Sequence, residues 1–521
     1  MPWRRIRMKK ILNKLFSRLF IFGVVILLQF FWIVYTLFVS SEQYYGVDIF
    51  IKVISVLIAL YVVYKDIRPY NKLSWVFLIL FLPIIGCPCF FLFGRSDMTK
   101  RSRNRMSEIE NMISPLRIQS EEVKEEIKAS SSVAFKQSNY ILNKAYYPVY
   151  REDTSRYYES GQDMFADMLN DLKNAREFIF LEFFIMEPGI MFDSIVDILE
   201  QKAKEGVQIR LIYDDLGCIK NFPPQYYQVL QKKGIHCACF NPFRPFLSII
   251  MNNRDHRKIL VIDGKIAYTG GVNLADEYIN KVERFGYWKD AGVRLTGDCV
   301  WSFTTMFLEM WSFITRGKED YTRFLVTENH NADQNMIHTK GFVQPYADCP
   351  LDKKYISEAV YLNLINHAEK YVYIFTPYLI IGTELATALI NAASSGVDVR
   401  IVTPEIPDKK LVYLLTQANY EPLIRGGVKI YQYLPGFIHS KCFVVDDEYA
   451  SVGSVNMDFR SLYLHFECGT LMYQTECVAQ LKADAMNTFT ECREISLADC
   501  ENKNIVIQML LSILHLFAPL L

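Results

Sequence analysis

One pattern occurs twice in this chain and limits its possible folds more than any other feature. In each copy a strand-like segment, a helical segment and a second strand-like segment follow one another, the order typical of α/β proteins. The strands begin at Phe178 and Gly206 in the first copy and at Tyr371 and Gly396 in the second, so the spacing is nearly the same in both. We therefore predict two similar α/β lobes related by a pseudo-twofold axis, each a mixed sheet flanked by helices.

Each copy ends with a more specific signature. In this signature a histidine, a lysine and an aspartate at fixed spacing precede a glycine turn that ends in asparagine. It comprises His256, Lys258, Asp263 and Gly270-Gly271-Val272-Asn273 in the first copy, and His439, Lys441, Asp446 and Gly453-Ser454-Val455-Asn456 in the second. The order and the spacing within the signature are identical in the two copies. A third His-x-Lys, at residues 338–340, lacks the aspartate and the turn, and we interpret it as ordinary surface.

The chemistry of these residue types explains their spacing. Residues i and i+2 of a strand face the same side, so each histidine and its lysine point into one cleft. Asp263 and Asp446, seven positions after the histidines, face the other way, which favours a structural role even though they belong to the catalytic signature. Two such half-sites offer two imidazoles, two ammonium groups and the amides of Asn273 and Asn456. That set can hold one phosphodiester without a metal, while one histidine attacks phosphorus and the other protonates the leaving oxygen.

A nucleophilic imidazole needs a partner that fixes its tautomer, usually a carboxylate on its other nitrogen. Asp290 and Glu467 are candidates for this role, because each follows the histidine of its own copy at a similar distance along the chain. We predict that each acid orients the histidine of its own half.

The N-terminal part, residues 1–95, has the character of a membrane module. Residues 1–18 are basic and contain no acid, and the uncharged run 19–39 is long enough to cross a bilayer. The apolar run 49–64 is short, and the run 73–93 contains two prolines and a glycine, which suits a bent helix or a re-entrant segment. Basic clusters at both ends of the module favour the cytoplasm, so the number of spans and the side of the catalytic part stay open.

We divide the rest of the chain into three segments. Residues 96–140 are charge-rich and predict a solvated linker helix, residues 141–330 the first lobe, and residues 331–521 the second. Within the second lobe, residues 504–521 form an apolar segment with scattered polar positions. We expect it to be an amphipathic helix that packs on the core or lies in the membrane interface.

Composition excludes several classes of protein. Lysine and arginine total 57, as do aspartate and glutamate, and this balance argues against binding nucleic acid through charge. A hydrophobic fraction of 51% excludes a disordered chain. The 12 cysteines are scattered, without zinc-site spacing, which predicts free thiols and favours a cytoplasmic catalytic part.

The paired signature resembles the two HKD motifs of the phospholipase D superfamily, whose members react through a phosphohistidine. The resemblance covers roughly residues 70–521 and is strongest to bacterial cardiolipin synthases. The segments that carry this narrower resemblance are Trp75…Leu82-Pro83…Gly86…Phe93-Gly94-Arg95, residues 211–217, residues 253–258, Thr376-Pro377-Tyr378 and residues 435–441.

The resemblance implies a function. His256 would be the nucleophile and His439 the acid that then becomes the base, while Lys258, Lys441 and the two asparagines hold the phosphate. It implies phosphatidyl transfer from one phosphatidylglycerol to another, releasing glycerol and forming cardiolipin, by a multi-pass protein of the bacterial plasma membrane. No cofactor, metal or nucleic acid is expected. The lipid range and the oligomeric state stay open.

Three other functions remain as alternatives: a hydrolytic phospholipase D that uses water as acceptor, a nuclease of the same superfamily, and a catalytically inactive membrane scaffold. The chain also departs from the family pattern. Asp255 stands where the family usually has asparagine, and its charge would lie beside the phosphate. Ala347-Asp348-Cys349-Pro350 replaces the family's Ser-Gly-Pro-Asp, and the run 19–39 is additional.

Overall fold

The computed structural model describes residues 45–94, 99–219, 222–223, 226–242, 252–326 and 341–501, with residues 511, 514, 516 and 518. The run 19–39, the His-x-Lys at 338–340, the boundary at 330/331 and most of 504–521 lie outside the described residues. The chain divides into two compact units. One contains the helices α3–α5, and the other, within Thr99–Pro242 and Asn253–Leu511, contains the repeated α/β part.

The first unit is built from the helices α3 (Tyr45–Tyr64), α4 (Pro69–Phe81) and α5 (Pro83–Phe93). Among the described helices only one, at Gly46–Tyr64, is long and apolar enough to cross a membrane. The run 73–93 is broken at Leu82, where proline begins the next helix, so it is a bent pair of helices that are individually too short to span. The number of spans therefore stays a prediction.

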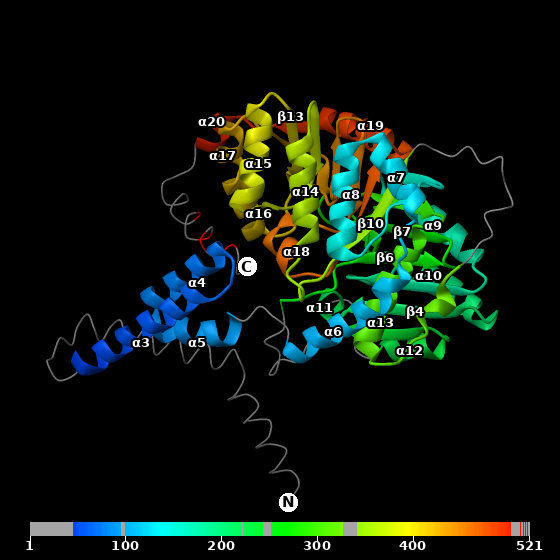
Figure 1. The fold of residues 1–521 in the computed structure, drawn as a ribbon, viewed down its shortest axis with the longest axis horizontal. Helices are drawn as coiled ribbons and strands as arrows, with labels where there is room; N and C mark the ends of the chain where they lie inside the picture. Colours follow the sequence, from blue (N-terminus) through cyan, green and yellow to red (C-terminus); the bar gives the residue numbers. More distant parts are fainter. Residues whose placement is uncertain are drawn as a thin grey trace, which may run out of the picture. The chain divides into compact units, whose positions relative to one another are not determined.

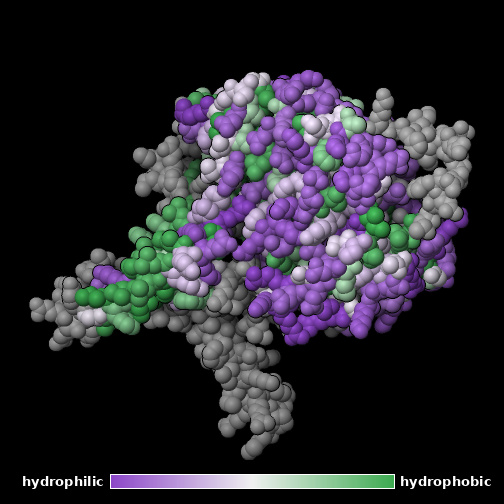
Figure 2. All heavy atoms as spheres, viewed as in Figure 1, coloured by the Kyte–Doolittle hydropathy of each residue, from purple (hydrophilic) through white to green (hydrophobic). Residues whose placement is uncertain are grey.

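The three helices share a small core that includes Val62, Trp75, Ile79 and Phe90. At Gly86 the chain comes so close to α4 that an added Cβ would lie 2.4 Å from the Leu78 carbonyl oxygen. The rest of the unit's surface is largely apolar, since hydrophobic residues gather over α3–α5, whereas the visible surface of the second unit is mostly hydrophilic (Figure 2). This exposed apolar surface on α3–α5 suits contact with lipid.

The second unit contains two large mixed sheets flanked by helices, which confirms the predicted fold class (Figure 1). The seven-stranded sheet has the order β2 (Ser155–Tyr158), β9 (Gly292–Thr296), β7 (Ile266–Gly270), β6 (Lys258–Ile262), β3 (Phe178–Phe183), β4 (Gln208–Asp214), β5 (His236–Phe240). The nine-stranded sheet has the order β1 (Tyr150–Arg151), β10 (Phe342–Asp348), β19 (Glu467–Tyr473), β17 (Tyr449–Gly453), β16 (Cys442–Val445), β11 (Tyr371–Phe375), β13 (Asp398–Pro404), β14 (Lys429–Tyr433), β20 (Cys492–Glu494).

The two sheets repeat the same connections. β3 is parallel to β4 and antiparallel to β6, and β11 is likewise parallel to β13 and antiparallel to β16. The sheets meet where β7 packs against β17 and β19. Every residue of β3, β6, β11 and β16 is buried, as expected for strands covered on both faces.

Helices pack against both sheets. In the first lobe they are α9 (Gly161–Lys173), α10 (Ile190–Lys204), α11 (Asp215–Cys218), α12 (Tyr226–Lys232) and α13 (Val300–Thr315). In the second lobe they are α14 (Ile356–His367), α15 (Thr383–Ser394), α16 (Lys410–Ala418), α17 (Tyr420–Arg425), α18 (Phe459–Tyr463), α19 (Glu476–Thr490) and α20 (Leu497–Glu501). All 12 cysteines are unpaired, as the sequence predicts.

The described part of the segment 96–140, residues 99–140, is not a solvated linker. It forms α6 (Lys100–Ile113) and α7 (Glu121–Ser130) and enters α8 (Ser132–Ala145), and each helix buries an apolar face. α6 packs against α13 of the first lobe, whereas α8 packs against α14 and β10 of the second (Figure 1). The charges that suggested a linker lie on the outer faces, and the apolar residues at helical spacing between them hold these helices on the lobes.

Candidate active site

Each signature histidine is anchored by the backbone of the other lobe. The amide of His256 donates to the Phe466 carbonyl (2.9 Å), and the amide of His439 donates to the Lys289 carbonyl (2.7 Å). Next to His439, strand β15 (Gly436–Ile438) runs parallel to β8 (Tyr287–Lys289). Both histidines are buried, so the seam between the lobes fixes their positions.

The carboxylates are exchanged between the lobes. Nδ1 of His256 lies 2.9 and 3.0 Å from the two carboxylate oxygens of Glu467, and Nδ1 of His439 lies 2.7 Å from Oδ2 of Asp290. The structure brings both acids into contact with the histidines, but each acid contacts the histidine of the other half and not that of its own, and the orienting role stays a prediction. Each acid directly follows the residue whose carbonyl anchors the opposite histidine, so the backbone pairing dictates the exchange.

Burial favours the neutral form of both imidazoles. It lowers the pKa of His439 to about 4, and burial together with the charge of Lys258 lowers the pKa of His256 well below its usual value. Burial alone would raise the pKa of Asp290, but His439 and Lys441 outweigh it and the net pKa is lowered. A neutral imidazole with Nδ1 on a carboxylate keeps its proton at Nδ1 and leaves the Nε2 lone pair available for attack.

The two lysines are also buried at this seam. Nζ of Lys258 donates to the carbonyl of His256, and Nζ of Lys441 donates to the carbonyl of His439. Burial lowers the pKa of Lys258 to about 8 and that of Lys441 to about 7. An anion bound between them would favour the charged form of each, so these ammonium groups are suited to hold a phosphate.

The two aspartates of the signature are held far from the histidines. Asp263 has φ +52° and accepts hydrogen bonds from the amides of residues 176–178 at 2.7 to 2.9 Å. Asp446 has φ +55° and accepts from the amides of residues 369–371 at 2.6 to 2.8 Å. Strand β6 places Asp263 about 16 Å along the chain from Lys258. The structure therefore gives these aspartates a structural place and not a catalytic one.

The two asparagines are tied to their own lobes. Oδ1 of Asn273 accepts from the Ile185 amide (3.0 Å), while Nδ2 donates to the Tyr278 hydroxyl (2.7 Å). Nδ2 of Asn456 donates to the Ser461 hydroxyl (3.1 Å). Each amide nitrogen carries a second hydrogen, so a phosphate contact stays a prediction for both.

The glycine turns differ at one position. Gly271 is in van der Waals contact with Asp290, since an added Cβ would lie 2.0 Å from its Oδ1. Its counterpart in the second turn is Ser454, whose hydroxyl donates to Oε2 of Glu467. One turn thus makes room for its carboxylate, and the other turn binds its carboxylate.

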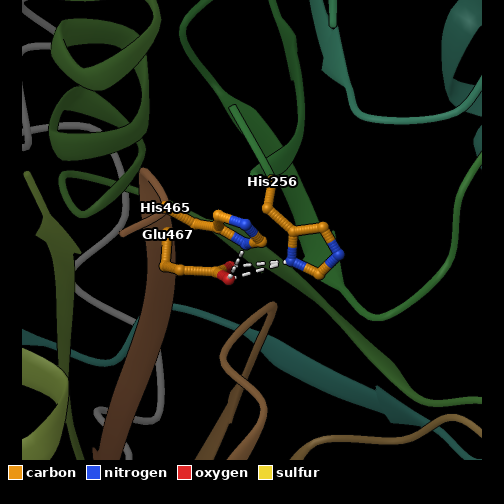
Figure 3. Close-up of side chains that lie close together, drawn as sticks. All are labelled: His256, His465 and Glu467. Atoms are coloured by element: carbon orange, nitrogen blue, oxygen red, sulfur yellow. Dashed lines mark hydrogen bonds and ion pairs between the residues drawn. The ribbon is translucent and has the colours of Figure 1, made fainter. Parts of the chain in front are cut away.

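His465 also belongs to the site, although the sequence pattern assigned it no role. It is buried, and its Nδ1 lies 3.7 Å from Oε1 of Glu467, with its ring centre 5.5 Å from that of His256 (Figure 3). Trp288 stands at the same place in the other half, two residues before Asp290, and its Nε1 donates to Oδ2 at 3.4 Å. In the sequence, His465 and Trp288 each stand two residues before one of the acids, and residues at this spacing share a face of an extended segment. This spacing was the signal that could have pointed to both residues.

Asp255 does not face the phosphate position. Its carboxylate lies 3.4 Å from Nε of Arg257, which pairs with Glu182 at 2.6 Å. Burial raises the pKa of Asp255, and Arg257 opposes this shift. The expectation that Asp255 adds a charge beside the phosphate is therefore wrong, because residues at odd and even positions around His256 face opposite sides.

A second departure from the family pattern is at residues 347–350, of which the first three line a cavity of about 390 Å³ that Arg257 also lines. Asp348 accepts from the amides of Ile356 (2.6 Å) and Ser357 (2.9 Å), at the start of α14. The place of Asp348 is therefore structural.

Comparison with known proteins finds two matching families. The family described as "Cardiolipin synthase, PLD-like domain" matches residues 168–285 and 361–488, and the family "Phospholipase_D-nuclease N-terminal" matches residues 53–95. A cardiolipin synthase of a Geobacillus species is 32% identical over 481 residues, which covers 91% of this chain and 94% of that protein.

A protein of Streptococcus mutans named only as uncharacterized is 41% identical over 463 residues, covering 89% of this chain and 99% of that protein. Among solved structures, the phosphatidylserine synthase of Haemophilus influenzae aligns with a TM-score of 0.57 at 16% identity. The alignment covers 74% of this chain and all of that chain, and it supports the two-lobed fold alone.

Proposed function

Because the chain belongs to the cardiolipin synthase-like proteins of the phospholipase D superfamily, we propose that it transfers a phosphatidyl group from one phosphatidylglycerol to another. The products are cardiolipin and glycerol. The observation that carries the proposal is the exchanged pair of His–carboxylate contacts, His256 with Glu467 and His439 with Asp290, beside two buried lysines.

In the first step Nε2 of His256 attacks the phosphorus of phosphatidylglycerol. A P–N bond forms, the P–O bond to the headgroup glycerol breaks, and His439 supplies the proton that leaves with the glycerol. Glu467 stabilises the imidazolium character that develops on His256. The anionic phosphate favours the protonated form of His439 that this step requires.

In the second step the primary hydroxyl of another phosphatidylglycerol replaces glycerol in the site. The neutral His439 takes its proton, the new P–O bond forms, and the P–N bond to His256 breaks. One phosphodiester replaces another, so no nucleotide is needed. Burial of both histidines supports the exclusion of water during the life of the phosphohistidine.

Lys258 and Lys441 would hold the non-bridging oxygens of the phosphate, with the second amide hydrogens of Asn273 and Asn456. These groups neutralise charge on the phosphoryl group in both steps. The chemistry assigned to these residues requires no metal.

We place the protein in the bacterial plasma membrane as a multi-pass protein that meets its lipid substrates there. The apolar surface of α3–α5 and the helix at Gly46–Tyr64 support attachment to the membrane. Nucleic acid is not an expected partner.

Product analysis tests this function. The full chain in mixed micelles with acyl-labelled phosphatidylglycerol and EDTA should produce cardiolipin and release glycerol in equal amounts. Phosphatidic acid as the main product would mean that water is the acceptor, and the hydrolytic phospholipase D would replace the synthase. Full cellular function of a His256→Ala variant would instead support an inactive scaffold.

A further inference from the structure

His256, His465 and Glu467 form a compact group of possible metal ligands (Figure 3). One ligand atom of each residue lies within 4.8 Å of the others, and all three residues are buried. Throughout the part of the chain that the structure describes, no other group of three or more histidines, cysteines or acids comes this close together.

Two of the three distances within the group are close to those around a tetrahedral ion, and the third, between the two imidazoles, is within 4.8 Å. The contacts of Glu467 are 2.9 Å to Nδ1 of His256 and 3.7 Å to Nδ1 of His465. Ligands bound at about 2.0 to 2.1 Å around a tetrahedral Zn²⁺ lie about 3.3 Å apart. Shifts of a few tenths of an ångström would bring both contacts to that spacing.

His465 supplies the second, independent observation. Its side chain is nine-tenths buried, and neither ring nitrogen has a hydrogen-bond partner among the residues that the structure describes. A buried polar group without a partner costs free energy. Here the ring lies beside the carboxylate at more than hydrogen-bond distance, so a ligand between them would give the ring nitrogen the partner it lacks.

In the half-site around His439, the residue that corresponds to His465 cannot bind a metal. There Trp288 occupies the position of His465 and donates its N–H to Asp290 at 3.4 Å. An indole is a donor only and has no lone pair for a metal. Only the half around His256 therefore has the ligand set of two imidazoles and one carboxylate.

We propose that His256, His465 and Glu467 bind a zinc-class divalent cation that switches the enzyme off. Two imidazoles select Zn²⁺, Co²⁺ or Cu²⁺ over Mg²⁺ and Ca²⁺, which prefer oxygen ligands. Three protein ligands leave a fourth position open, which the phosphate or water can fill.

The inhibition follows from the tautomer of His256. A metal ion bound at Nδ1 displaces the hydrogen bond to Glu467, and the proton of the neutral imidazole then resides on Nε2. Nε2 no longer has a lone pair to attack phosphorus. The proposed inhibition rests on the proposed function, whereas the proposed metal binding does not.

Metal binding is tested on the full chain in detergent, stripped with EDTA and desalted in the presence of a non-thiol reductant. Titration with Co²⁺ should produce the visible absorption of a tetrahedral site, and competition with a chromophoric chelator should give one Zn²⁺ per chain. His465→Asn and, as a second variant, His465→Gln should weaken binding at least about tenfold. The matched control His236→Asn, at an exposed histidine of β5, should bind as the wild type does.

Equal Zn²⁺ affinity of the wild type and both folded His465 variants would overturn the site. Measurements of turnover test the proposed inhibition. Zn²⁺ should inhibit the wild type and His236→Asn, whereas His465→Asn should keep most of its own metal-free rate when Zn²⁺ is added. Binding without inhibition would overturn the switch. A chain that forms no cardiolipin in EDTA but still binds Co²⁺ through His465 would overturn the proposed function and keep the metal site.

Discussion

The two halves of the active site are alike in backbone and different in the residues around each carboxylate. His256 contacts Glu467, which also has Ser454 and His465 as neighbours. His439 contacts Asp290, whose neighbours are Gly271 and Trp288. The common backbone delivers a carboxylate to each Nδ1. The different neighbours allow the two histidines to have unequal roles, which a perfectly symmetric site could not assign.

The largest effects should come from substitution of the two histidines. If the two variants behaved alike, the unequal roles assigned to the two halves of the site would be wrong. His256→Ala and His439→Ala should each lower phosphatidyl transfer by about 10³-fold or more, because each removes a group essential to bond making or proton transfer. A phosphatidyl ester of p-nitrophenol, whose leaving group needs no proton, separates their roles. His439→Ala should release p-nitrophenol in a single burst and retain a covalent phosphatidyl group, detected by mass spectrometry.

His256→Ala should give neither a burst nor a covalent adduct with this substrate. A His236→Ala control should turn over as the wild type does, since His236 is exposed and lies at the far edge of the first sheet. An adduct in His256→Ala would reverse the roles of the two histidines.

The exchanged acids should have the next largest effects. Glu467→Gln and Asp290→Asn should each lower the rate by about 10² to 10⁴-fold, because the amides no longer hold the right tautomer or balance the imidazolium. With p-nitrophenol as leaving group, the burst of Asp290→Asn should recover and that of Glu467→Gln should not, since only Asp290 supports the proton donor. Pairing within each half would give the opposite pattern.

The glycine turns should show a smaller, unequal effect. Gly271→Ala places a Cβ 2.0 Å from Oδ1 of Asp290 and must displace it, so a loss in kcat of about 100-fold is expected. Ser454→Ala removes one hydrogen bond to Glu467, which is worth about a tenfold loss. Steady-state kinetics of both variants measure these losses, and thermal unfolding controls for a loss of stability. A larger loss of kcat in Ser454→Ala than in Gly271→Ala would contradict this ranking.

The smallest effect concerns stability against acid. Burial lowers the pKa of His465 to about 3 and that of His439 to about 4, below the value of about 6.5 in an unfolded chain. Between these values the unfolded chain binds more protons, so the stabilising contribution is present above pH 6.5 and is lost as the pH falls.

The unfolding temperature should therefore fall between pH 6.5 and 4, and His465→Asn should flatten this dependence. His236→Asn should leave it unchanged. An equal slope in the wild type and His465→Asn, measured by calorimetry, would show that His465 is not kept neutral in the folded chain.

The expected architecture followed from the sequence because its signals are local. The repeated alternation of strands and helices predicted two mixed sheets, and β3, β4, β11 and β13 lie where expected. Charge density was a poor guide at residues 96–140, because the apolar faces of α6–α8 pack on lobes that a linear pattern does not show.

By itself the sequence determined which residue types meet at the site, since the spacing of His256 and Lys258 is repeated by His439 and Lys441 in the second copy of the signature. It also separated the aspartates from the cleft through the two-residue period of a strand. Only the tertiary structure decided which acid serves which histidine. That choice depends on backbone hydrogen bonds between the lobes, from His256 to Phe466 and from His439 to Lys289, which join segments far apart in the chain.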